Sequence, residues 1–130
     1  MTTLKFISAS LLVALCAACT DSPTGSPGRS VFIVVPEQVA VRSGASAQLV
    51  NHSGGPIHVG AISCGVQTDR QTDAGWTEVP RRGSDCPQPD FLLANGTAYT
   101  FVFSTPTTSG NFRLRLGADD PVISNRFAVR

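Results

Sequence analysis

The sequence is poor in the residues that most often carry chemistry or bind metal. Its 130 residues include two histidines and one methionine, and no Gly-x-Ser-x-Gly turn, phosphate-binding loop or dinucleotide fingerprint occurs. His52 and His58 lack a third ligand at a recognisable spacing, and Met1 lies in a leader that is removed, so it cannot supply the thioether of a blue-copper site. We therefore expect no enzyme, no metal and no cofactor, and two solvated surface histidines.

An excess of charge of one sign is also missing. Ten basic residues face nine acidic ones, and every basic residue after Lys5 is an arginine. Such a near-neutral chain offers no field that would steer nucleic acid, so we expect no nucleic-acid partner. Arg81-Arg82 and the alternating pair Arg113 and Arg115 are either solubilising charges or a surface that recognises an anionic partner. The aspartates fall in turns, where they are typical of backbone caps and not of paired catalytic acids.

Long apolar runs are rare, and the one of note stands at the start of the chain. Lys5 is followed by an apolar segment over residues 6–18 that ends in Ala17-Ala18, the small residues that a signal peptidase requires. The segment is too short to span a bilayer, so it is typical of a leader that is cleaved. We expect residues 1–18 to be a signal peptide.

The end of this leader, Leu15-Cys16-Ala17-Ala18-Cys19, resembles the lipobox of bacterial lipoproteins. In that family the last cysteine receives a diacylglycerol and becomes the new N-terminus, which implies lipidation of Cys19 and attachment to a membrane. The match departs from the usual pattern because Cys16 stands where an aliphatic residue is common and Leu15 lies one place further upstream. Plain secretion is the alternative. Two or three acyl chains would make the anchor effectively permanent.

The residues after Cys19 are rich in proline, glycine, serine and threonine, so we expect residues 19–30 to form a flexible tether behind the lipidated cysteine. In the lipoproteins that this leader resembles, an aspartate directly after the cysteine retains the protein in the inner membrane. Thr20 occupies that position here, and Asp21 comes second. The resemblance thus implies the outer membrane in a bacterium that has two membranes.

Cysteine is scarce in the rest of the chain. Once Cys16 has left with the leader and Cys19 carries lipid, Cys64 and Cys86 remain. An even remainder in an exported domain predicts a disulfide bond, because the compartments outside the inner membrane are oxidising. The alternative is a metal site or a reactive thiol, which no Cys-x-x-Cys spacing or neighbouring histidine pair supports. We expect a disulfide between Cys64 and Cys86.

No helix-period apolar stripe of useful length occurs after the leader. Short runs rich in Val, Ile, Phe and Thr recur instead between Gly, Pro, Asn and Ser clusters, which predicts one all-β domain over residues 31–130. Asn95-Gly96 predicts a hairpin turn, and Pro36 predicts a break where the first strand crosses between sheets. The candidate strands are residues 31–35, 38–41, 47–51, 57–64, 76–79, 91–93, 98–103, 111–116 and 122–129.

Residues 65–87 are predicted to be a surface loop apart from the short strand at 76–79. This stretch includes Cys86. Trp76 lies in it, and we expect this side chain to anchor the core or the loop and not to form a ligand platform. The two cysteines are only 22 positions apart. Their disulfide would therefore not cross the core as the bond of an antibody domain does.

Several segments resemble small bacterial secreted immunoglobulin-like domains and, less closely, the intracellular-proteinase-inhibitor domain of bacilli. The resemblance rests on residues 51–59, 75–79, 92–96, 110–114 and 124–129. It implies an immunoglobulin-like antiparallel β-sandwich of seven to nine strands. Residues 95–96 and 111–112 depart from the Pro-Gly and Thr-Tyr that such domains usually carry, which leaves the expected fold unchanged. No reactive-site residues of an inhibitor are identifiable.

These observations predict a non-enzymatic lipoprotein of the bacterial cell envelope, held at the membrane by its N-terminal lipid. Its sandwich would bind or support another envelope component, a protein or a glycan, through loops at one end. A secreted protease-inhibitor module is the alternative, and only the family resemblance suggests it.

Overall fold

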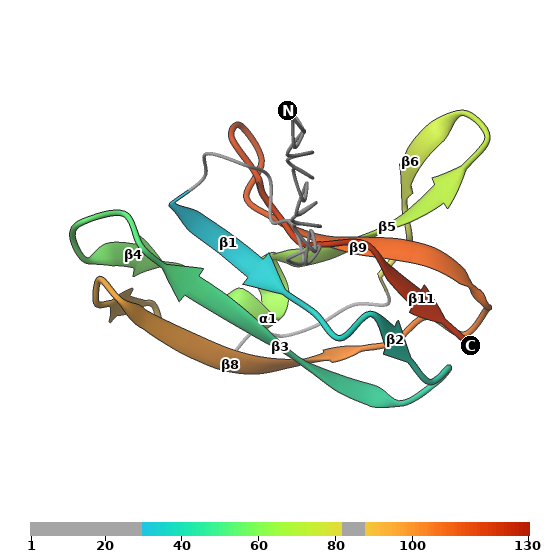
Figure 1. The fold of residues 1–130 in the computed structure, drawn as a ribbon, viewed down its shortest axis with the longest axis horizontal. Helices are drawn as coiled ribbons and strands as arrows, with labels where there is room; N and C mark the ends of the chain where they lie inside the picture. Colours follow the sequence, from blue (N-terminus) through green and yellow to red (C-terminus); the bar gives the residue numbers. More distant parts are fainter. Residues whose placement is uncertain (1–29, 82–87) are drawn as a thin grey trace, which may run out of the picture.

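The computed structural model describes residues 30–81 and 88–130, and strands dominate both stretches (Figure 1). Eleven strand segments and one helical turn follow one another in these two stretches. The elements are β1 (Val31–Val34), β2 (Gln38–Val39), β3 (Gly44–Asn51), β4 (Ile57–Val59), α1 (Ile62–Gly65), β5 (Val66–Thr72), β6 (Gly75–Glu78), β7 (Phe91–Leu93), β8 (Thr97–Ser104), β9 (Gly110–Leu116), β10 (Val122–Ile123) and β11 (Phe127–Val129).

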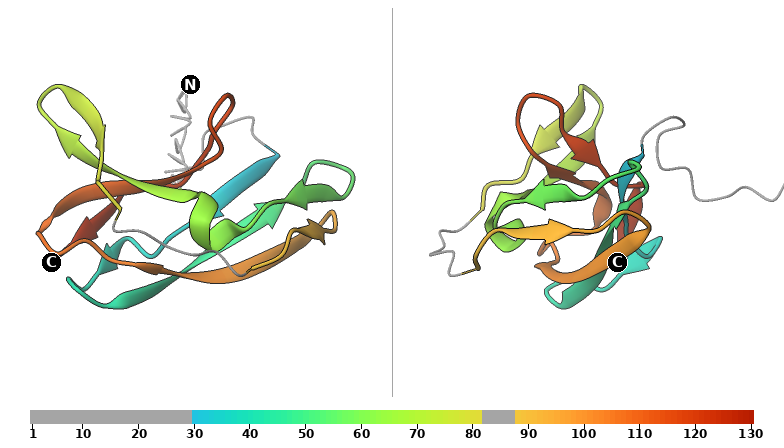
Figure 2. Two further views of the ribbon diagram at one scale, coloured as in Figure 1. Left: turned by 180° about the vertical axis from the view of Figure 1, so that it is seen from behind. Right: turned by 90° about the vertical axis from the view of Figure 1, so that its left-hand side faces the viewer.

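The strands form two layers, which Figure 2 shows from behind and from one end. The smaller sheet has the order β1-β3-β8, and β3 pairs antiparallel with β8 along its whole length. The larger sheet has the order β2-β11-β9-β5-β6, with β10 paired to β9. Within it only β2 and β11 run parallel. A further pair, β4 with β7, forms a two-stranded sheet.

The first strand divides between the two layers. β1 pairs with β3 in the smaller sheet, and β2 pairs with β11 in the larger one. Pro36 lies in the connection between them, which confirms the predicted crossing, because proline cannot donate a hydrogen bond to a ladder. This division, and the grouping of β1, β3 and β8 against β11, β9, β5 and β6, matches strands A, B and E against G, F, C and C′ of an immunoglobulin domain. The expected all-β, immunoglobulin-like sandwich is confirmed.

The core lies between the layers and follows the expected alternation. Phe112 and Leu114 of β9 are buried, whereas the side chains between them face outward. Phe127 of β11 lies 5.6 Å from Phe103 of β8, ring centre to ring centre, and so links the larger sheet to the smaller one. Aromatic pairs of this kind add to the stability that burial alone provides.

Two local predictions are corrected. Asn95-Gly96 does form a tight turn, in which Gly96 has a φ of 76° that favours glycine. The strands on its two sides do not pair with each other, however, because β7 pairs with β4 and β8 pairs with β3. The strand expected over residues 57–64 ends at Val59, and the chain then makes the helical turn α1.

The largest error concerns the loop expected over residues 65–87, because most of its described part is sheet. β5 pairs with β9 on one side and with β6 on the other, so it is a central strand of the larger sheet. Its sequence, Val-Gln-Thr-Asp-Arg-Gln-Thr, contains a single apolar residue and therefore shows no apolar alternation.

Candidate binding groove and its charged rim

A row of charged and aromatic side chains crosses the outer face of the larger sheet; we name it the charged ladder. It consists of Trp76, Arg113, Asp69, Arg115 and Glu78. The strand register places these residues together, because Asp69 on β5 lies opposite Arg113 on β9 and opposite Glu78 on β6. The ladder therefore joins three neighbouring strands.

Asp69 is the centre of the charged ladder. Arg113 Nε donates a hydrogen bond of 3.0 Å to Asp69 Oδ2, and Arg115 Nε lies 3.3 Å from the same oxygen. Arg115 Nη2 donates a second bond, of 2.7 Å, to Glu78 Oε2. The guanidinium of Arg113 lies 4.5 Å from the centre of the Trp76 ring, within the range of a cation–π contact. Charges of opposite sign thus alternate along the ladder.

Asp69 is only 3% exposed, so its carboxylate has lost most of its water. A buried charge is tolerated when it is paired and hydrogen-bonded, and the two arginines meet that condition. The hydrogen bond to Asp69 is the main cause that raises the pKa of the Arg115 guanidinium above its ordinary value, and Glu78 acts in the same direction. Arginine keeps its charge in proteins, and these two carboxylates favour the charged form of Arg115 further.

A groove of about 580 Å³ opens at the end of the sandwich where β9 ends and β10 begins. Both layers contribute to its walls. The apolar lining comes from Val31, Leu49, Ile57, Val59, Leu116, Ala118 and Val122. Its size falls within the range of small-molecule and side-chain binding sites, and its lining is mainly apolar, as such sites usually are.

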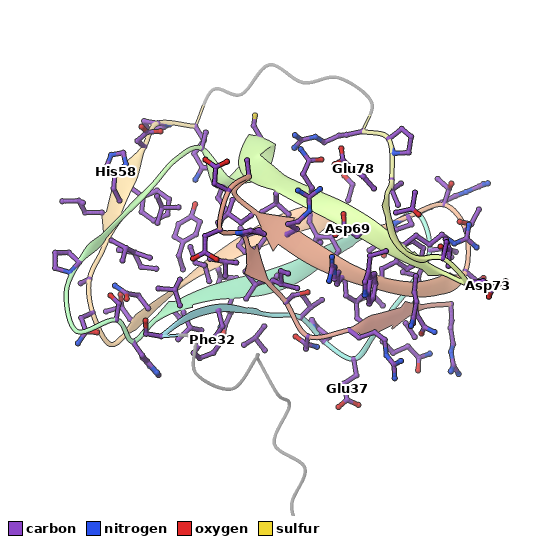
Figure 3. The ribbon with its side chains drawn as sticks, turned by 90° about the horizontal axis from the view of Figure 1, so that it is seen from above. Phe32, Glu37, His58, Asp69, Asp73 and Glu78 are labelled. Atoms are coloured by element: carbon purple, nitrogen blue, oxygen red, sulfur yellow. The ribbon has the colours of Figure 1, made fainter. Side chains whose placement is uncertain are left out.

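One end of the charged ladder lies at this groove, since Arg115 and Glu78 belong to both. On the other side stands His58, which belongs to β4 and whose Nε2 lies 3.8 Å from Asp90 Oδ2. Figure 3 shows His58 and Glu78 on separate elements at the two sides of this region. The groove thus combines apolar walls with hydrogen-bonding and charged groups at its mouth, an arrangement suited to binding an apolar group with polar neighbours.

The two histidines singled out in the sequence do not come together as a ligand pair. His52 packs edge-on against Phe32, with ring centres 5.7 Å apart, whereas His58 lies beside Asp90. Within residues 30–81 and 88–130, no group of three or more potential metal ligands occurs.

The arginines and the tryptophan have more defined roles than the sequence indicated. Arg113 and Arg115 are ion-paired to Asp69. Arg81 donates to the backbone carbonyls of Val66 and Cys64 and so ties the chain after β6 to the start of β5. Trp76 lies on the edge strand β6, is 36% exposed and carries Arg113 on its ring, so it is not part of the core.

Cys64 lies in α1, two residues before β5 begins. Its expected partner Cys86 falls outside the described residues, as do Arg82, the signal peptide at 1–18 and Cys19 with most of the tether. The disulfide and the lipid anchor therefore stay predictions.

The residue that the sequence reading missed is Asp69. The sequence predicts a turn aspartate at this position, because an isolated aspartate among polar residues carries no burial signal. Only the register of β5 against β9 reveals that it faces two arginines.

Comparisons with known proteins place few constraints on this chain. No protein-family model matches the sequence, and no curated protein matches it. Among solved structures, the ASH/PapD-like domain of human CEP192 (PapD-like domain 7) is similar over 96% of this chain and 94% of that one, with 14% identity and a TM-score of 0.33. The fold assignment therefore rests on the strand order and register of this chain itself. Across the described stretches, no helix has the length and apolar character needed to cross a membrane.

Proposed function

We propose that this protein is a non-enzymatic, lipid-anchored binding module of a bacterial cell envelope. In this proposal residues 1–18 direct export, Cys19 carries the lipid, residues 19–30 form the tether, and the sandwich over residues 31–130 binds another envelope component. The outer membrane is favoured if the cell has two membranes, and secretion without lipid is the alternative. The leader and its lipobox-like end support the location.

The groove with its charged rim is the observation that carries the binding role. Apolar walls exclude water from a bound group, and the charged ladder and His58 offer polar contacts at the mouth. Such a surface suits an apolar segment of a protein better than a glycan, whose surface is mostly hydroxyl groups. We therefore propose a protein partner that inserts an apolar side chain between the layers.

A substitution in the groove wall tests the binding role. Ala118 lines the groove and is exposed, so Ala118→Arg fills the groove without disturbing the core. Thr107→Arg is the matched control, because Thr107 is also exposed but lies in the connection between β8 and β9, at the opposite end of β9. After crosslinking the full chain in the cells that export it, we expect the co-purifying envelope protein to be lost with Ala118→Arg and retained with Thr107→Arg. Equal recovery with both variants contradicts the proposal.

A separate substitution tests the anchor. Cys19→Ser should move the protein from the membrane fraction to the soluble fraction, because it removes the acceptor of the lipid. Cys16→Ser is the control and should leave the protein in the membrane fraction. If Cys19→Ser still sediments with membranes, the lipid is not at this residue.

A further inference from the structure

The edge of the smaller sheet differs from the other edges of the sandwich. β8 is the last strand of the order β1-β3-β8, and no strand pairs with its outer side within the described parts of the chain. It spans eight residues, Thr-Ala-Tyr-Thr-Phe-Val-Phe-Ser, without a charge, a proline or a glycine. Natural proteins usually protect an edge with charge, proline or a short strand, because a bare edge pairs with other strands.

The other edges within the described residues have that protection. β4 and β7, which form the two-stranded sheet, have only three residues each. β6, at one edge of the larger sheet, has four residues and carries Glu78. β2, at the other edge, has two residues and follows Pro36. β1 meets a short parallel bridge from Ile33 to Ser124 at its free side. β8 is therefore the exception.

The backbone of β8 has donors and acceptors directed away from β3. One position beyond the ladder, Thr105 N donates to Ser43 O and Ser43 N donates to Thr105 Oγ1, so the backbone groups of these two residues are turned toward each other. Because hydrogen-bonded pairs alternate along an antiparallel ladder, the odd-numbered residues of β8 bond to β3 and the even-numbered ones present their N–H and C=O groups to the open side. These are Ala98, Thr100, Val102 and Ser104, whose side chains are also exposed.

We propose that β8 is a self-association strand, and that a second copy of this chain pairs with it antiparallel about a two-fold axis at Thr100. In this register Thr100 faces Thr100 of the second copy, and Val102 faces Ala98. Only even-numbered residues then form hydrogen-bonded pairs, which is what the free backbone groups require. The pairing places the 65% exposed Val102 against an apolar residue and joins two threonines, both favourable cross-strand pairs.

A second copy suits this edge because of symmetry and charge. A two-fold interface is self-complementary, and on either side of Thr100 the register sets Ala98 against Val102 and Tyr99 against Phe101, which are pairs of similar residues. After Lys5 nine arginines are balanced by nine acidic residues, so two copies of the mature chain repel each other weakly. The proposal does not depend on the groove, which lies between the layers and not along the β8 edge.

Cysteine crosslinking of the full chain in the cells that export it tests this register. In the proposed pair the two Thr100 Cα atoms are about 5.5 Å apart, whereas the two Ser104 residues are offset by eight positions, or roughly 27 Å. With a short thiol crosslinker, we expect Thr100→Cys to give a covalent homodimer roughly tenfold more abundant than Ser104→Cys does, since only the first pair lies within reach. The unsubstituted chain shows the background from its own cysteines.

A charge on the edge provides the second arm. Val102→Lys, added to Thr100→Cys, should abolish the homodimer, because lysine at an edge opposes strand pairing. Gln38→Lys is the control, since Gln38 is exposed on β2, and it should leave crosslinking unchanged. Self-pairing would be overturned if Thr100→Cys gave no crosslinked homodimer, or if Ser104→Cys gave as much as Thr100→Cys. It would also be overturned if the homodimer persisted with Val102→Lys, or if the crosslinked band contained a different protein.

Discussion

β5 and β8 reverse the usual relation between position in a sheet and sequence. β5 is a central strand and is almost entirely polar, whereas β8 is an edge strand and carries no charge. Each is explained by its neighbours. β5 is held because Asp69 pairs with Arg113 and Arg115, and β8 is held because its alternate residues enter the core. In this sandwich a strand's place thus follows from the partners of its side chains, which are ion-pair partners for β5 and core residues for β8.

The largest expected effect comes from the inward side of β8. Phe101 is 6% exposed and lies in the core, so Phe101→Ala should lower the free energy of unfolding by about 3–5 kcal/mol. Val102, the next residue, is 65% exposed, and Val102→Ala should change the free energy of unfolding by less than about 0.5 kcal/mol. Denaturant unfolding of both variants measures the difference. Similar values would mean that β8 is not packed as described.

Reduction of the predicted disulfide should have the next largest effect. Cys64 lies just before β5, so a bond to Cys86 would restrain the start of this strand. Loss of the bond should lower the free energy of unfolding by about 3 kcal/mol in the chain-entropy model. Hydrogen exchange with and without reductant, together with peptide mapping under non-reducing conditions, checks this. We expect faster exchange in β5 and unchanged exchange in β8; free thiols in the mature protein would refute the bond.

Removal of the carboxylate at the centre of the charged ladder should lower the free energy of unfolding somewhat less than reduction of the disulfide does. Asp69→Ala leaves two arginines without their main partner, and we expect a loss of about 2–3 kcal/mol, because both guanidinium groups keep some access to water. Asp73→Ala is the control, since Asp73 is exposed in the turn between β5 and β6, and it should be nearly neutral. Equal stability of the two variants would show that β5 does not depend on the ladder.

The smallest effect is expected at the end of the ladder. Trp76→Leu removes the ring under Arg113, a partly exposed contact worth about 0.5–1 kcal/mol. Thr77→Ala, at the next residue of the same edge strand, is the control. Trp76 is the single tryptophan, so its fluorescence offers a second measurement in a protein that keeps it. Arg113→Ala should shift the wavelength of maximum Trp76 emission, because it removes the charge on the ring. An unchanged spectrum would argue against the contact.

The sequence predicted those parts of the fold that depend on apolar alternation. Alternating apolar residues predict β9 and β8, a continuous apolar run predicts β1, and the chemistry of proline predicts the crossing at Pro36. β5 was missed because its position depends on ion pairs with residues more than forty positions away. The pairing of β7 with β4 was missed for a similar reason, since the Asn95-Gly96 turn specifies a local bend and not a strand partner.

The candidate site was harder to predict than the fold. Arg113 and Arg115 stood out as alternating charges, but their partner Asp69 had no recognisable signal. The groove is lined by residues from β1, β3, β4, α1, β5, β6, β9 and β10 that have no common motif. Segments far apart in the sequence form it, so only the tertiary structure reveals it.

The central claim, that this sandwich is displayed from a lipid anchor on an exported chain, is tested most directly by the intact mass of the native polypeptide. We predict a mature chain that begins at Cys19 and carries the mass of two or three acyl groups. A chain that still begins at Met1 and carries no modification would contradict the account.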